Sequence, residues 1–516
     1  MRDNKLIAGI LFLAWSVHFV LIWAFRFVPS IDYPNWLLEA RVISQYGTAA
    51  NPFSTCYEIL AAPIPNGGFV LPVALLATFL PIEIAGKIVL STYVIGLPLA
   101  IRSFLRSIGN TSLVWTIAIL LLFNVSFVFG NFSFLLGLCL LFTVLAYAER
   151  RKGRFTNRTA VAFLALTIAV FLAHGLCAVV LFLYQLFRLC EHATTLKERG
   201  ALASSILSMI IMGVYYYVAR PEHMSDAIFW GLMSRQRAGL LSTTFIAGWA
   251  FPPYEFSLIR TLANAVVPLF LICVGIASMP RLIKTLSSSA TAKLTLSALA
   301  ITLLGPMSVL GVSGLPQRFA LICSLLMVGF LRLPARTERL IMVSAAGLLI
   351  FVTAIRWRDY HESSNCIRNE YVFLKTILPT HATVLTLEDD LGGAGVPWHH
   401  FIPHRLHLMF QTYYQIMAGG CDPNIFGTGY VQPGRELYTV TAGLLSRHAP
   451  NQFLTLRGDS IPQPIEYIIL HTHSRWGDEM SRALQSDFSP QGQTEIAPGL
   501  RTMVLKRLGE GARSNG

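Results

Sequence analysis

The chain has 516 residues, of which 54% are hydrophobic and only 13% are charged, and its mean hydropathy is +0.57. A soluble multidomain protein of this length is not so apolar, so the composition excludes that class and predicts a polytopic membrane protein. The net charge of +13 is then expected to come from basic cytoplasmic loops, and we predict no nucleic-acid partner.

Apolar runs with few charges mark the expected membrane spans. A helix crosses a hydrocarbon core of about 30 Å with roughly 20 apolar residues. Eleven runs approach that length: 6–27, 83–102, 112–129, 132–149, 159–173, 175–188, 202–219, 260–280, 293–312, 315–333 and 338–355. The apolar stretch 68–81 is too short and contains two prolines, so we expect it to be interfacial or re-entrant.

The basic residues predict the orientation, because cytoplasmic loops are rich in Lys and Arg. An N-terminus inside the cell places every basic loop in the cytoplasm: Arg102 with Arg106, 149–158, 188–200, Arg281 with Lys284, and 332–339. Three parts then face outward, namely loops 28–82 and 220–259 and the tail from residue 356. We interpret the first span as a retained anchor and the outer face as the periplasm of a bacterial inner membrane.

The tail differs in composition from the rest of the chain. Its sequence predicts strands at 382–389, 465–473 and 501–508 and helices at 367–378 and 477–486. The fold class is therefore an all-α polytopic membrane domain of about 11 transmembrane helices, residues 1–355, followed by an extracytoplasmic α/β domain, residues 356–516.

The segment 159–187 contains 29 uncharged residues between two loops that must lie on the same side. At 1.5 Å per residue it is about 43 Å long, too long for one span and too short for two full ones. We predict a break at His174–Gly175, with His174 on the floor of an outward-facing recess. An intramembrane histidine favours a functional site, whereas the alternative is a turn histidine bonded to a neighbouring carbonyl.

Asp32 lies just after the first span. It precedes an expected surface helix with Pro34 in its first turn, and an aspartate in that position is typical of an N-cap. Capping and catalysis both remain open from this local pattern alone.

The layout of the whole chain resembles the GT-C superfamily of polyprenyl-phosphate-sugar-dependent glycosyltransferases. The resemblance covers most of the chain and rests on IDYPNWLLEAR (31–41), FNVSFVFGNFSFLLGLCLLFTVLAYAERR (123–151), FLAHGLCAVVLFLYQLFR (171–188) and GLPQRFALICSLL (314–326). Many members carry a second acid beside the first, whereas here the neighbours of Asp32 are Tyr33 and Pro34.

The resemblance implies a membrane enzyme that transfers a hexosyl or pentosyl group from a polyprenyl-phosphate donor to a glycan, lipid or protein acceptor, with inversion and without a required cofactor. An acceptor hydroxyl needs a base, for which Asp32 is the candidate, assisted by Glu39, with Glu58 as a third carboxylate. The leaving phosphate needs cations, for which Arg318, Arg235 and Arg237 are candidates together with His174. Snorkelling of Arg318, and contact of Arg235 and Arg237 with lipid head groups, are the structural alternatives.

Two other functional classes stay open. A transporter or flippase of lipid-linked glycans commonly shows paired halves, and none are apparent in this sequence. A non-catalytic scaffold of the same fold would not need Asp32.

Cysteines and histidines give two further predictions. Cys56, Cys366 and Cys421 lie outside the spans, and we predict a disulfide between Cys366 and Cys421 because both belong to the tail. The tail also holds nine of the thirteen histidines, including HHFIPHRLHL at 399–408, with His399, His400, His404 and His407 as possible ligands. Because no HExxH or CxxC framework accompanies them, we expect a connecting loop there and no metal site.

Overall fold

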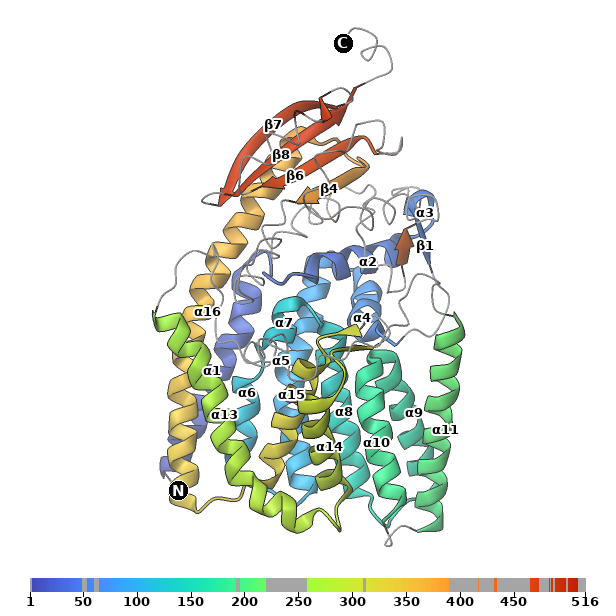
Figure 1. Ribbon diagram of the computed structural model, residues 1–516, viewed down its shortest axis with the longest axis vertical. Helices are drawn as coiled ribbons and strands as arrows, with labels where there is room; N and C mark the ends of the chain where they lie inside the picture. Colours follow the sequence, from blue (N-terminus) through green and yellow to red (C-terminus); the bar gives the residue numbers. More distant parts are fainter. Residues whose placement is uncertain are drawn as a thin grey trace.

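The structure is a computed structural model. It describes residues 2–48, 53–59, 65–191, 195–219, 258–309, 312–388, 431–433, 465–472, 488–497 and 500–508, with the isolated positions 416, 482, 484 and 485. A bundle of roughly parallel helices forms the main body, and a small sheet lies beyond one end of it, at the top of Figure 1.

The helices of the first half of the chain are α1 (Arg2–Ala24), α2 (Tyr33–Gln45), α3 (Phe53–Cys56), α4 (Gly67–Ala77), α5 (Ile82–Ser107), η1 (Leu113–Thr116), α6 (Ile117–Leu120), α7 (Val125–Phe129), α8 (Phe132–Arg150), α9 (Asn157–Ala173), α10 (Gly175–Leu189) and α11 (Leu196–Ala219). Those of the second half are α13 (Leu258–Thr285), α14 (Ala290–Leu304), α15 (Leu315–Met327), η2 (Val328–Phe330) and α16 (Ala335–Ile377).

Most of the predicted spans correspond to helices. Within the described residues, five helices are long and apolar enough to cross a membrane: α5, α8, α11, α13 and α16. The shorter apolar helices include α9, α10, α14, α15 and the described apolar part of α1. Eleven full spans are therefore more than the helix lengths support, although the apolar segments lie where the sequence predicted them.

Two predicted spans are wrong in detail. The segment 112–129 is broken into η1, α6 and α7, because the Asn124 side chain accepts from the Ser126 N–H at 2.8 Å and donates to the Leu121 carbonyl at 2.8 Å. These bonds replace helical ones and start a new helix. The segment 293–312 ends as a helix at Leu304 and continues into the hairpin of β2 (Ser308–Val309) and β3 (Val312–Ser313).

The predicted break in 159–187 is confirmed. Helices α9 and α10 meet at His174, which is extended at φ −165° and ψ 126°. The stretch 68–81 contains α4, whose 11 residues span only about 16 Å and include Pro72. A Cβ on Gly68 would lie 2.9 Å from the Ala173 carbonyl oxygen, so α4 packs tightly against the end of α9.

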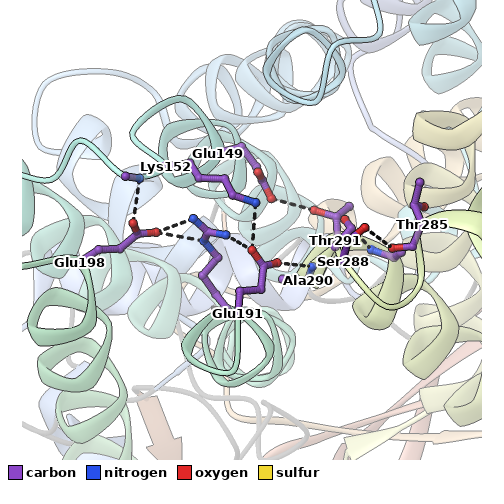
Figure 2. A network of polar contacts seen from close by, with 12 residues as sticks. Glu149, Lys152, Glu191, Glu198, Thr285, Ser288, Ala290 and Thr291 are labelled. Atoms are coloured by element: carbon purple, nitrogen blue, oxygen red, sulfur yellow. Dashed lines mark hydrogen bonds and ion pairs between the residues drawn. The ribbon is translucent and has the colours of Figure 1, made fainter. Parts of the chain in front are cut away.

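The basic turns lie at the same end of the bundle as the N-terminus (Figure 1). Figure 2 shows a polar network there. Arg188, at 1% exposure, binds Glu198 at 3.0 and 2.7 Å and also contacts Glu191. Lys152 binds Glu191 at 2.9 Å, and the network ties the α8–α9 turn to α10, α11 and the start of α14.

At the opposite end, α16 extends out of the bundle and carries the sheet (Figure 1). Its 43 residues run without interruption through the predicted domain boundary at 355/356, so the expected helix 367–378 is the end of this helix. The division into domains remains a prediction.

The sheet has the order β4-β6-β8-β7, formed by β4 (Val384–Glu388), β6 (Tyr467–Thr472), β8 (Leu500–Arg507) and β7 (Phe488–Ala497). Strands β4 and β6 are parallel and the other pairs are antiparallel. The three predicted strands are confirmed, whereas β7 was not predicted. Most of the predicted helix 477–486 lies outside the described residues.

One described contact holds the sheet against α16, and another joins the tail to the loop 28–82. The fully buried side chains of Glu370 on α16 and His471 on β6 bind one another. Strand β1 (Tyr57–Ile59), in the first outer loop, pairs antiparallel with β5 (Val431–Pro433) of the tail. The first loop and the tail therefore meet above the same end of the bundle.

Candidate functional site

The backbone around Asp32 is fixed against the end of α7. The Ile31 N–H donates to the Val128 carbonyl at 3.0 Å, and the Asp32 N–H donates to the Phe129 carbonyl at 3.2 Å. The Trp36 indole donates to the Gly130 carbonyl at 2.8 Å. Gly130 has φ +84°, and a Cβ there would lie 2.9 Å from the Asp32 Cβ. A glycine therefore allows the close approach that sets the position of Asp32.

The carboxylate of Asp32 does not cap α2. Asp32 occupies the N-cap position, as predicted, but its φ of −90° and ψ of −3° are helical and its side chain makes no capping hydrogen bond. The side chain is only partly exposed. Burial raises the pKa of Asp32 to about 7, and the positive charge of Arg318 partly opposes this shift. The alternative role of Asp32, capping of α2 by its side chain, therefore lacks the hydrogen bond that defines a cap.

Arg318 comes from the first turn of α15. Its Nη2 donates to the Asn131 Oδ1 at 2.8 Å, and its guanidinium lies 5.6 Å from the centre of the Phe134 ring. Its Nη1 lies 3.5 Å from His174 Nε2. Arg318 is thus held in place from α8 and from the α9–α10 break.

The protonation of His174 follows from its backbone contact. Its Nδ1 accepts from the Leu176 N–H at 3.1 Å, so the neutral ring carries its hydrogen on Nε2. Nε2 and the Arg318 Nη1 are then both donors, and they lie 3.5 Å apart. An oxygen anion could accept from both, so the chemistry of this pair suits a phosphate.

Asp32 and Arg318 interact electrostatically. Between these two residues, both of which the structure describes, no direct ion pair is formed. The site therefore presents a carboxylate and two N–H donors, and the carboxylate does not neutralise Arg318 by direct contact.

The other predicted site residues have different outcomes. Glu39 is buried on α2, at 1% exposure, and Glu58 lies in β1. The assisting role of Glu39 stays a prediction. Arg235 and Arg237, with the whole loop 220–257, lie outside the described residues, so their phosphate contacts are also untested.

Sequence reasoning missed Asn131 and Phe134, which orient Arg318. The residues stand 187 and 184 positions before it, and only tertiary structure brings them together. Their one sequence signal is an asparagine directly before an apolar span, where a polar side chain needs a partner.

The state of Cys366 contradicts the predicted disulfide between Cys366 and Cys421. Cys366 is a free thiol, buried on α16 among apolar side chains, and Cys421 lies outside the described residues. Burial in the helical core explains why the thiol does not need a partner. Within the described residues no group of three His, Cys, Asp or Glu side chains is placed to hold a metal ion, and the histidine run 399–408 lies outside them.

The fold has a counterpart among the solved structures. The chain is similar over 98% of its length to the crystal structure of ArnT from Cupriavidus metallidurans bound to undecaprenyl phosphate, with 98% of that chain covered, a TM-score of 0.53 and 11% sequence identity. No protein-family model and no curated protein sequence matches the chain. The backbone arrangement of the chain is therefore similar to that of this ArnT structure, and the superfamily and its activity belong to the proposal below.

Proposed function

We propose that the chain is a GT-C-type glycosyltransferase that moves a hexosyl or pentosyl group from a polyprenyl-phosphate donor to an acceptor at the membrane surface. The observation that carries the proposal is the presence of a carboxylate that makes no capping bond, Asp32, together with two N–H donors of Arg318 and His174 that lie 3.5 Å apart. The likeness to an undecaprenyl-phosphate-bound structure supports a lipid phosphate as the ligand.

In this proposal Asp32 acts on the acceptor. An acceptor hydroxyl hydrogen-bonds to the carboxylate, and its oxygen attacks the anomeric carbon as the proton passes to Asp32. Because the attack comes from the face opposite the phosphate, the anomeric configuration inverts. A carboxylate with a pKa of about 7 is basic enough to take a proton from a hydroxyl in the transition state and is still partly ionised at neutral pH.

Arg318 and His174 act on the donor. As the bond between the anomeric carbon and the phosphate oxygen breaks, the phosphate retains the electron pair and gains negative charge. The Arg318 guanidinium, already oriented by Asn131, and the His174 Nε2–H are placed to stabilise that charge. No step of this scheme requires a metal ion. In this proposal Glu39 and the tail contribute to binding the acceptor.

The test compares the wild type with Asp32→Asn in liposomes. Substrates are a small panel of undecaprenyl-phosphate-linked hexoses and pentoses, labelled in the sugar, with envelope lipid extract as acceptor. Asparagine is also a good N-cap, and the structure shows no capping bond to lose, so we expect unchanged expression and thermal stability. The loss of the base should slow transfer about 100- to 10,000-fold.

Near-normal transfer by Asp32→Asn would remove Asp32 from the reaction and direct the search to Glu39 and Glu58. Binding of the lipid without any sugar transfer by the wild type would favour a scaffold. Movement of intact lipid-linked sugar across the bilayer would favour a flippase.

A further inference from the structure

A buried lysine near the start of α5, Lys87, has no role in the proposed reaction. It lies one turn into α5 at 8% exposure, and its Nζ donates to the Phe25 carbonyl at 2.6 Å. An ammonium group has three donors, and this carbonyl takes one of them. Among the described residues no carboxylate forms a direct ion pair with Lys87. Buried charges are normally paired, so an anion from outside the chain is the expected partner.

Two arginines add to this positive charge. Arg26, at the end of α1, lies 3.9 Å from Glu83 with its side chain 53% exposed, and Glu83 also interacts electrostatically with Lys87 and Arg41. Three cations therefore share one carboxylate. The excess positive charge lies where α1 ends and α5 begins.

An apolar groove with a volume of about 430 Å³ lies directly below these cations, between α1 and α5. The groove is lined by Phe19 and Trp23 of α1 and by Ile88, Ser91, Thr92, Ile95 and Gly96 of α5. The α5 residues recur every three or four positions and so form one stripe of the helix. Trp23 is 39% and Ile95 43% exposed, so the groove is open toward the lipid side of the bundle.

The groove and the cations are connected through hydrogen bonds. The Trp23 indole donates to the Ser91 hydroxyl at 3.0 Å, and that hydroxyl donates to the Lys87 carbonyl at 2.7 Å. The Lys87 ammonium also lies 5.9 Å from the centre of the Trp23 ring. The polar head group of an elongated ligand in the groove would therefore lie next to the Lys87 ammonium.

We propose that this site binds an anionic phospholipid of the membrane, with an acyl chain in the α1–α5 groove and the phosphate at Lys87 and Arg26. The chemistry is that of a lipid because the lower part is apolar and open to the bilayer, whereas the upper part carries excess positive charge. The site shares none of its residues with Asp32, Arg318 and His174, so the proposal does not depend on glycosyl transfer.

The test is native mass spectrometry of the full chain purified in detergent and titrated with phosphatidylglycerol or with phosphatidylcholine of the same acyl chains. We expect about 30-fold tighter binding of phosphatidylglycerol, since each of the two basic residues near the lipid surface contributes about 1 kcal/mol. Arg26→Gln is exposed enough to leave the fold intact and should reduce this preference about fivefold. Lys87→Gln should reduce it similarly, whereas Arg154→Gln, on an exposed turn at the other end of the bundle, should not.

A second pair of variants tests the groove. Thr92→Trp fills it from an exposed position, whereas Leu99→Trp places the same side chain at an exposed position of α5 that does not line it. Only Thr92→Trp should weaken binding of both lipids, by about tenfold or more. Equal affinity of the wild type for the two lipids, unchanged preference in Arg26→Gln, or retention of undecaprenyl phosphate alone would overturn the proposal.

Discussion

Two polar clusters lie at opposite ends of the bundle and differ in how their charges are matched. At the N-terminal end, Arg188 and Lys152 face Glu191 and Glu198, two cations against two carboxylates. All four carboxylate oxygens accept: the Ala290 N–H donates to Glu191 Oε1 at 2.6 Å, the Gly153 N–H donates to Glu198 Oε2 at 2.8 Å, and the cations contact the other two oxygens (Figure 2).

In the outer cluster, formed by Asp32, Arg318 and His174, the charges are not matched by direct contacts. Arg318 donates to a neutral amide, Asn131, and faces a second donor on His174, while Asp32 makes no capping bond. A fully satisfied buried network stabilises one arrangement of the helices. In the proposed function, the donors of Arg318 and His174 and the carboxylate of Asp32 remain available for a ligand. The proposal therefore treats the Arg188 cluster as structural and the Arg318 cluster as functional, although each contains an arginine shielded from solvent.

The largest expected effect concerns the stability of the N-terminal-end network. Arg188→Met leaves Glu191 and Glu198 buried with like charges and should lower the free energy of unfolding by about 3–5 kcal/mol. Arg318→Met removes a cation that has no carboxylate in direct contact, so the loss should be smaller. Unfolding of both variants in detergent, followed by tryptophan fluorescence, measures the difference. Equal losses would mean that the comparison of the two clusters does not separate structure from function.

The second expected effect concerns affinity for the lipid phosphate. Arg318→Lys keeps the positive charge but loses the planar pair of donors that binds both Asn131 and a phosphate oxygen. Hydrogen bonds to charged groups contribute about 1.5–3 kcal/mol, so the dissociation constant for undecaprenyl phosphate should rise about 10- to 100-fold. Microscale thermophoresis measures this constant, with Arg154→Lys as the control. Unchanged affinity would favour the alternative that Arg318 snorkels to the membrane interface and does not bind the phosphate.

Much of this site could be predicted from the sequence, because charged and ionisable residues are rare inside the apolar spans and at the ends of the spans away from the basic loops. Asp32, Arg318 and the break at His174 each stand out against uncharged surroundings, and the structure places Arg318 in contact with His174. Asn131 and Phe134 do not stand out, since their role depends on a contact across more than 180 residues.

The fold was predictable to a similar degree. Apolar runs located the helices, but they could not show that the Asn124 side chain would interrupt one of them. Nor could they show that the last span continues to Ile377 as one helix. The composition becomes polar near residue 356, whereas the helix continues through that point. The free thiol of Cys366 follows from that continuity, since it places the cysteine on a buried face of α16.

A third prediction separates backbone strain from the placement of the carboxylate. Gly130→Ala and Gly153→Ala both put a Cβ on a residue with positive φ, at +84° and +70°. Each should lose about 1–2 kcal/mol of stability. Only at Gly130 does the new Cβ meet Asp32, at 2.9 Å, whereas nothing lies within 4 Å of a Cβ at Gly153.

We therefore expect Gly130→Ala to slow sugar transfer about 5- to 30-fold, which corresponds to a strain of 1–2 kcal/mol carried into the reacting geometry, and Gly153→Ala to transfer normally. Transfer rates in liposomes, normalised to folded protein, measure the two effects. If both variants were equally active, the contact between Gly130 and Asp32 would have no bearing on the reaction.

The smallest expected effect is a pH dependence that only the outer cluster shows. A base with a pKa of about 7 is half ionised at that pH, so kcat/KM should reach half of its plateau near pH 7 and fall toward tenfold per pH unit below it. The sign for stability is opposite. The pKa of Asp32 in the folded protein lies above the ordinary aspartate value of 3.8, so folded protein holds more protons than unfolded protein between about pH 4 and 7. This contribution to stability decreases as the pH rises through that window. Asp32→Asn should abolish both dependences, whereas His174→Asn should lower the plateau of kcat/KM without moving its midpoint. If the midpoint of the kcat/KM profile shifted in His174→Asn and not in Asp32→Asn, His174 would be the titrating group, which would contradict the proposed roles of the two residues.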